Sequence, residues 1–170
     1  MDRISEQGLQ GLSEFLTWRT TLEPGQPVGL DISKDELSFY PIIYWPVSAS
    51  APMPSSAAIS RIDAYMRAGG TVLFDTRDQF SSLDNGGTTP NGERLQAILA
   101  NIDIPPLEPV PEDHVLTRSF YLLTNFPGRY NGSPLWVESR QGAAKTTSGL
   151  SSSGDGVTPI MITGNDFAGA

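Results

Sequence analysis

The amino-acid sequence predicts an α/β domain with a mostly parallel sheet. Residues 71–75 (TVLFD) and 159–163 (PIMIT) are short, almost wholly apolar runs, as expected of strands that are covered on both faces. Segments with the apolar spacing of helices alternate with the predicted strands along the chain. Strands that alternate with helices of about 10–15 residues are typical of βαβ units, in which neighbouring strands run parallel.

The first half of the chain is expected to form two helices around a buried strand. Apolar residues recur at helical spacing over 5–20, which predicts an amphipathic helix. The aromatic and β-branched stretch 37–45 (LSFYPIIYW) predicts a strand, whose first half Pro41 makes irregular or places at an edge. A second helix is predicted over 55–68, with its first serine as the cap and Gly69-Gly70 as its end.

In the second half, a third helix is predicted over 91–101 and another strand over 135–138. Residues 104–121 contain a proline-rich connection and a segment with no clear period, so no element is predicted there. Residues 140–157 are mainly Gly, Ser and Thr, which predicts a flexible surface loop. All three helices are expected to pack on a single sheet.

Length and composition predict the number of domains and argue against several classes of function. The chain has 170 residues, of which 38% are hydrophobic and 18% charged, so one domain is expected over residues 1–170. Because the sequence opens on a helix and ends just after a strand, this domain is expected to be part of a longer doubly wound domain, truncated at both ends. The net charge is −8 and the basic residues are scattered, which argues against a nucleic-acid partner. No apolar run approaches the ~18 residues of a membrane helix, so this segment is not expected to span a membrane.

The sequence lacks the residues that several kinds of reaction centre require. There is no cysteine, which excludes thiol catalysis and thiolate metal sites. The serine-rich run 149–154 (GLSSSG) is not a G-x-S-x-G motif and does not follow a predicted strand. Asp75, Asp78 and Asp84 do not have the register of a calcium loop. Neither phosphate-binding glycine motif is present, so no cofactor and no metal are expected.

His114 is the only histidine, and any general base of the serine-protease kind would have to use it. A single histidine beside Asp113 is more often a surface or interface side chain than a catalytic one. The catalytic alternative is a hydrolase in which His114 acts as general base with Asp75 or Asp166 as its partner.

Polar residues follow three predicted strands at the point where each strand ends. In open α/β sheets the ligand crevice lies beyond these carboxyl ends. The long connection before 135 is able to fold over the same edge and would bring further polar side chains to it. The predicted ligand-binding residues are Asp75, Arg77, Asp78, His114, Arg118, Asn165 and Asp166. The simpler alternative for Arg77 is a surface ion pair with Asp75 or Asp78.

Three stretches carry a resemblance to a known family: 35–47 (DELSFYPIIYWPV), 61–78 (RIDAYMRAGGTVLFDTRD) and 114–138 (HVLTRSFYLLTNFPGRYNGSPLWVE). They resemble an uncharacterised bacterial domain of unknown function, found at the C-terminus of membrane-anchored proteins of the aerotolerance-operon type and in shorter exported proteins. The resemblance implies a flavodoxin-like fold, similar to class I glutamine amidotransferase-like domains. It implies no assigned reaction, since nothing in this sequence matches the amidotransferase nucleophile.

Three hypotheses on function follow. The favoured one is a non-catalytic domain that binds a small polar ligand or a protein partner, as the soluble part of a larger bacterial envelope protein, with the periplasmic side slightly favoured. The second is a hydrolase or amidase acting on a sugar or peptidoglycan-like substrate. The third is a partner surface, possible also between copies of the chain, formed by the aromatic residues Phe39, Tyr40, Tyr44 and Trp45.

Overall fold

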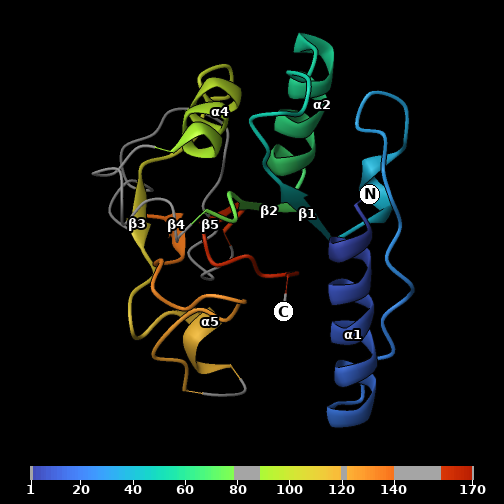
Figure 1. Cartoon of the computed structure of the whole chain (residues 1–170), viewed down its shortest axis with the longest axis vertical. Helices are drawn as coiled ribbons and strands as arrows, with labels where there is room; N and C mark the ends of the chain where they lie inside the picture. Colours follow the sequence, from blue (N-terminus) through green and yellow to red (C-terminus); the bar gives the residue numbers. More distant parts are fainter. Residues whose placement is uncertain (1, 79–88, 120–121, 140–157, 170) are drawn as a thin grey trace.

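The computed structural model describes residues 2–78, 89–119, 122–139 and 158–169. A five-stranded sheet in the order β1-β2-β5-β4-β3 organises these residues (Figure 1). Its strands are β1 (Ile42–Pro46), β2 (Thr71–Asp75), β3 (Leu107–Pro109), β4 (Trp136–Glu138) and β5 (Ile160–Thr163). The loop predicted over 140–157 lies outside the described residues.

The sheet is parallel in its central part, as the sequence predicts. β2 pairs in parallel with β1 on one side and with β5 on the other. β4 is antiparallel to both β5 and β3, so β3 runs in the same direction as β5. The carboxyl ends of β1, β2, β5 and β3 therefore all lie at one edge of the sheet, which we call the carboxyl edge. The opposite edge is the amino edge.

Two helices lie in the expected places, and the first of them has the cap that the sequence predicts. Ser55 precedes α2 (Ser56–Arg67), and its side chain accepts a hydrogen bond from the N–H of Ala58. Thr89 caps α4 (Pro90–Leu99) in the same way through the N–H of Gly92, and Pro90 occupies the first turn, where its missing N–H costs nothing.

Helices α2 and α4 lie on the same side of the row of strands in Figure 1. Their buried side chains and those of one face of β1, β2 and β5 form the main core, which includes Ile62, Leu95, Val72 and Phe74. The opposite face of the sheet carries a smaller cluster around Leu73, Leu135, Val137 and Met161. Phe126 and Phe167 pack on this smaller cluster.

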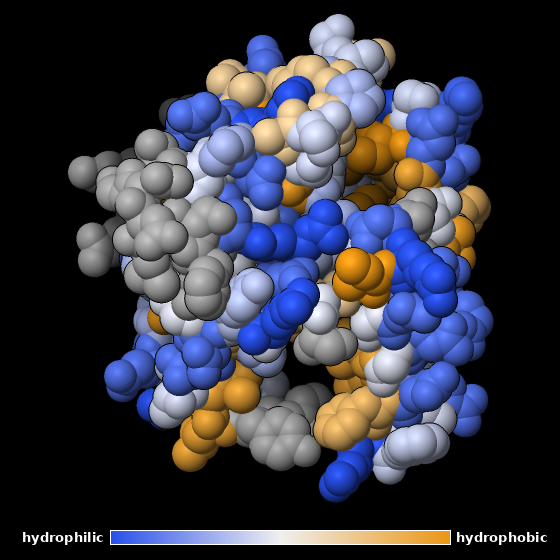
Figure 2. Space-filling model, in the orientation of Figure 1, coloured by the Kyte–Doolittle hydropathy of each residue, from blue (hydrophilic) through white to orange (hydrophobic). Residues whose placement is uncertain are grey.

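The prediction that the first helix packs on the sheet is wrong. Helix α1 (Arg3–Arg19) buries only Ser5, and none of its side chains belongs to either core cluster. One close contact of α1 with the rest of the fold is at Gly8, where a Cβ atom would lie 2.1 Å from the carbonyl oxygen of Ala168. Phe15 is 47% exposed and Trp18 80% exposed. In Figure 2, apolar side chains reach the surface on the side where α1 runs.

Two short elements fall where no element was predicted. β3 is an edge strand of three residues that ends on Pro109, and α5 (Val115–Arg118) is a single helical turn. Elements of three or four residues are too short to show a period of 2 or 3.6, so the sequence pattern carries no signal for them. The 3-10 turn η1 (Leu37–Phe39) occupies the part of 37–45 that Pro41 was expected to make irregular.

The aromatic surface proposed at 39–45 is not formed as expected. Phe39 is 79% exposed, but Tyr44 and Trp45 are only partly so. Trp45 packs against Phe74, with 5.4 Å between ring centroids, and belongs to the edge of the main core. Strand pairing, which alternates the side chains of β1 between the two faces of the sheet, places Tyr44 and Trp45 against different clusters.

Candidate functional site

The residues that follow β2 and β5 lie side by side at the carboxyl edge. Asp75 is the last residue of β2 and is the register partner of Thr163, the last residue of β5. Because the two strands are parallel neighbours, the segments 76–78 and 164–166 leave the sheet together.

The Asp75 carboxylate joins these two segments and is fully buried. Its Oδ1 accepts hydrogen bonds from the backbone N–H of Arg77 (3.0 Å) and of Asp166 (3.2 Å). Its Oδ2 accepts from the N–H of Phe167 (2.5 Å) and from the Tyr44 hydroxyl (3.0 Å). With four donors bound, Asp75 has little capacity left for a ligand. It is a structural anchor of the site.

Both residues that share Oδ1 of Asp75 have left-handed backbone conformations. Arg77 has φ 54° and Asp166 has φ 56°, and they are the non-glycine residues with positive φ in the described part of the chain. Such a conformation costs a non-glycine residue about 1–2 kcal/mol and persists where the surroundings enforce it. The two hydrogen bonds to Asp75 are the enforcing contacts.

Burial also raises the pKa values of Asp75 and of its hydrogen-bond partner Tyr44. Loss of hydration raises the pKa of the Asp75 carboxyl above its usual range, although the N–H groups and the Tyr44 hydroxyl oppose the shift. Burial, followed by the adjacent Asp75 charge, raises the pKa of Tyr44 as well. The Tyr44 hydroxyl therefore keeps its proton and remains a donor to Asp75 at neutral pH.

The charged side chains predicted beside Asp75 have other partners than expected. Arg77 pairs with Asp2, with 3.4 Å between Nη1 and Oδ2, and not with Asp75 or Asp78. Asp2 is the N-cap of α1 and accepts a hydrogen bond from the N–H of Ser5. Asp78 accepts hydrogen bonds from the hydroxyls of Thr76 and Thr89. Arg77 thus links the carboxyl edge to α1, and Asp78 links it to α4.

Asn165 fastens a second loop to the same edge. Its side chain is fully buried, and Nδ2 donates to the carbonyl oxygens of Phe126 (2.8 Å) and Ser133 (3.0 Å). Oδ1 accepts from the N–H of Ser133 at 2.9 Å. Between these two points, a Cβ atom on Gly128 would lie 2.4 Å from the Asn165 carbonyl oxygen, so only glycine fits. These contacts hold the loop 126–133 against the end of β5.

A pocket of about 260 Å³ lies between this loop and α5. Val110 after β3 and Leu135 before β4 place it at the carboxyl edge, where the sequence predicts the ligand crevice. Its lining combines apolar side chains with uncharged polar ones, and Glu112 is its charged residue. Within the described residues, the side chains of Thr124, Asn125 and Asn131 make no hydrogen bond. We call this cavity the carboxyl-edge pocket.

His114 and Arg118 come from α5, which forms one wall of this pocket, but neither lines it. His114 is 3% exposed and caps α5, with Nδ1 accepting the N–H of Leu116 at 3.2 Å. Arg118 donates from Nε to the Glu112 carbonyl oxygen at 2.9 Å. The hydrogen bonds and ion pairs of Asp75 and Asp166 do not involve His114, so the contact that the hydrolase alternative requires is not formed.

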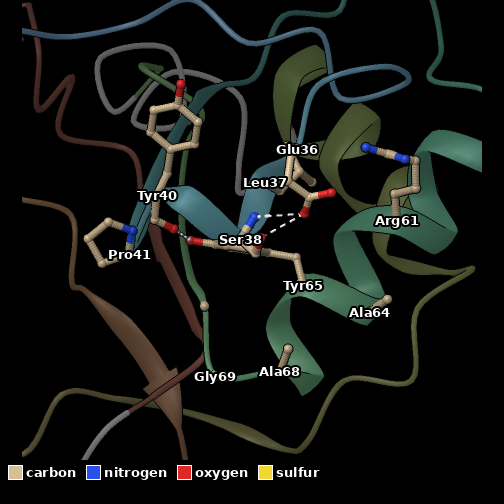
Figure 3. A pocket seen from close by; sticks show the side chains of 11 residues that line it. Glu36, Leu37, Ser38, Tyr40, Pro41, Arg61, Ala64, Tyr65, Ala68 and Gly69 are labelled. Atoms are coloured by element: carbon tan, nitrogen blue, oxygen red, sulfur yellow. Dashed lines mark hydrogen bonds between the residues drawn. The ribbon is translucent and has the colours of Figure 1, made fainter.

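A larger pocket, of about 410 Å³, lies at the amino edge. This is the edge opposite the one at which the sequence predicts the ligand-binding residues. Pro41 before β1 and Gly70 before β2 line it, together with η1 and the second half of α2 (Figure 3). We call it the amino-edge pocket.

Comparison with known families identifies the chain. A family model described as a domain of unknown function, DUF4159, matches residues 1–170. The chain belongs to the DUF4159 family. No curated protein matches the chain.

Two further observations on this DUF4159 domain concern metal ligands and membrane helices. The described residues contain no group of three His, Asp or Glu side chains placed to hold a metal ion. No helix in the described ranges is long and apolar enough to cross a membrane.

Sequence reasoning missed the residues that line the carboxyl-edge pocket. Asn131 precedes Gly132, a pair that by itself indicates a turn, and Thr124 and Asn125 lie in a segment with no predicted element. Their common position depends on the hydrogen bonds of Asn165, which join residues 32 and 39 positions apart in the sequence.

Proposed function

We propose that this chain is a non-catalytic binding domain and that the carboxyl-edge pocket holds a small polar ligand. The observation that carries the proposal is the fastening of the pocket wall: the buried Asn165 side chain holds both ends of loop 126–133. A preformed pocket with convergent polar groups is the usual form of a small-molecule site.

The size and lining of the pocket indicate the kind of ligand. At about 260 Å³ it is near the lower end of ligand pockets, which suits a single small molecule. The amide groups of Asn125 and Asn131 can each donate and accept hydrogen bonds. Glu112 and the net charge of −8 disfavour an anionic ligand.

Two features support binding over catalysis. The chain has no cysteine, and His114 is used as the cap of α5 with no bond to Asp75 or Asp166. The candidate carboxylate Asp75 is itself bound by four donors. General acid–base chemistry needs a titratable group within hydrogen-bond reach of a reacting atom, and these residues do not offer one.

The proposal extends to the wider context expected from the sequence. The parallel core of the sheet is compatible with a flavodoxin-like arrangement. We propose, from the resemblance described above, that the domain serves as the soluble recognition part of a membrane-anchored bacterial envelope protein.

A thermal-shift screen of sugars, nucleotides and amino acids tests the proposed function. We expect a compound that raises the melting temperature of the chain and loses this effect in Asn131→Ala. The matched control is Asn101→Ala, which removes an exposed asparagine near the end of α4, away from the pocket lining. A stabilising compound whose effect is the same in both variants would contradict the placement of the site. The absence of any stabilising compound, together with no change in backbone amide resonances at 123–133, would contradict the proposed function.

A further inference from the structure

The amino-edge pocket is a slot between η1 and the second half of α2. One wall consists of small residues of α2, Ala64 and Ala68, and the slot ends at Gly69 and Gly70. The Tyr65 ring is fixed on this side by hydrogen bonds from its hydroxyl to the carbonyl oxygens of Tyr40 (2.8 Å) and Thr71 (3.3 Å). The small side chains leave the space open, and the fixed ring keeps its shape.

Opposite charges lie together in the lining of this slot. Figure 3 shows the Glu36 carboxylate on the η1 side turned toward Arg61 on the α2 side. Arg61 is held by hydrogen bonds from Nε to the Ile32 carbonyl oxygen (2.8 Å) and from Nη2 to that of Asp35. The guanidinium is therefore fixed by neutral carbonyl groups and forms no ion pair within the described residues.

Both charged groups keep hydrogen-bonding capacity for a ligand. Arg61 uses Nε and Nη2, which leaves the N–H groups of Nη1. Glu36 accepts both bonds from Ser38 on Oε1, which leaves Oε2. These bonds from Ser38, and more weakly the Arg61 charge, lower the pKa of Glu36, so the carboxylate is ionised at neutral pH. The C-terminal end of α2 adds partial negative charge near Gly69.

We propose that the amino-edge pocket binds a free α-amino acid with an apolar side chain. Its carboxylate would pair with Nη1 of Arg61, its ammonium group with Oε2 of Glu36, and its side chain would lie along Ala64, Ala68 and Tyr65. A guanidinium and a carboxylate side by side are complementary to a ligand that carries both charges. A simple anion would be repelled by Glu36, and a simple cation by Arg61. This site is separate from the carboxyl-edge pocket and does not depend on the function proposed for it.

Titration of the 170-residue chain with L-leucine, followed by amide resonances in heteronuclear NMR spectra, tests the inference. We expect shifts at Ser38, Gly69 and Gly70. 4-Methylpentanoate lacks the ammonium group and 3-methylbutylamine lacks the carboxylate, so each should bind more weakly than leucine. Ala64→Leu, which places a larger side chain at an exposed helical position, should fill the slot and abolish the shifts.

Glu36→Gln tests the role of the charge. Glutamine can still accept from Ser38, and position 36 is exposed, so the variant is expected to fold. Leucine should bind about two- to fivefold more weakly, as expected for an exposed ion pair, while 4-methylpentanoate should bind as well or better. The matched control, Glu14→Gln, makes the same charge change at an exposed position of α1, outside the lining of both pockets, and should leave leucine binding unchanged.

Four outcomes would overturn the inference. The first is an absence of shifts at Ser38, Gly69 and Gly70 with leucine up to about 20 mM. The second is equal weakening of leucine binding by Glu36→Gln and Glu14→Gln, and the third is undiminished binding to Ala64→Leu. Leucine shifts confined to 123–133 would also overturn it, while supporting the function proposed for the carboxyl-edge pocket.

Discussion

The backbone N–H of Asp166 donates a hydrogen bond to Oδ1 of Asp75, at 3.2 Å and across 91 residues of sequence. This bond ties the segment after β5 to the end of β2. The same oxygen also holds the N–H of Arg77, so a single buried carboxylate sets the backbone of both segments at the carboxyl edge. The charged side chains presented there are therefore positioned by Asp75, which does not itself face a ligand.

Asp75→Asn should destabilise the fold strongly. Each carboxylate oxygen of Asp75 accepts two hydrogen bonds, and in asparagine an NH2 group, which cannot accept, replaces one of these oxygens. The buried N–H or O–H groups that lose their acceptor then cost about 1–3 kcal/mol each. Urea unfolding measures the loss. Asp103→Asn is the control, because Asp103 has an exposed side chain and should change stability by less than about 1 kcal/mol. A similar small change in both variants would contradict the anchoring role.

Replacements of Arg77 separate the backbone effect from the loss of charge. Arg77→Gly should be more stable than Arg77→Ala by about 1 kcal/mol, because only glycine adopts a φ of 54° without cost. Both variants lose the partly exposed ion pair with Asp2, which is worth about 0–1 kcal/mol. Thermal unfolding of the two variants gives the comparison, and equal stability would show that the left-handed conformation is not enforced.

Gly128→Ala should destabilise the chain and weaken the binding of any ligand to the carboxyl-edge pocket. Its Cβ atom would lie 2.4 Å from a backbone oxygen of Asn165, so the loop must shift, with a typical cost of about 1–3 kcal/mol. Gly11→Ala is the matched control: nothing lies within 4 Å of its Cβ position, and in the middle of α1 it should gain up to about 1 kcal/mol. Chemical unfolding of both variants tests the opposite signs.

Glu138 makes the stability of the chain depend on pH. Burial raises the pKa of Glu138 above the ordinary value of 4.5. At a pH between these two pKa values, the folded state keeps a proton on Glu138 that the unfolded state has lost. The unfolded state then binds fewer protons, and stability falls as pH rises from about 4.5 through the raised pKa. Relative to the natural chain, Glu138→Gln should therefore gain stability over this window and show a constant advantage above it. Urea unfolding at several pH values measures the difference, and a difference that shrinks with rising pH would contradict the assignment.

The chain should release no ammonia from glutamine above background. An amidotransferase reaction needs a nucleophile, and there is no cysteine for this role. A coupled assay for ammonia, with His114→Ala as the comparison, tests this expectation. Activity that a single substitution abolishes would overturn the non-catalytic proposal.

Much of the sheet could be predicted from local patterns. The strand 71–75 and the cap at Ser55 were predicted at their observed positions, because apolar runs and capping residues act over a few neighbouring residues. The placement of Asp75 and Asp166 at one edge followed from a topological rule that needs only strand order and direction. The hydrogen-bond partners of the polar side chains at this edge could not be predicted in this way. Asp75 and Asn165 look like ligand-binding groups in the sequence, but in the structure their polar atoms bind backbone groups and, at Asp75, also the Tyr44 hydroxyl.

The sequence by itself determined the class of fold, the parallel core of the sheet and the absence of thiol chemistry, since these depend on composition and on periods of 2 and 3.6 residues. Only the tertiary structure decided that α1 leaves most of its apolar side chains exposed, that Arg77 pairs with Asp2, and that Asn165 brings loop 126–133 to the end of β5. The reason is physical. A buried polar group must find a hydrogen-bond partner, and its partner is selected by distance in the folded chain, which sequence separation does not reveal.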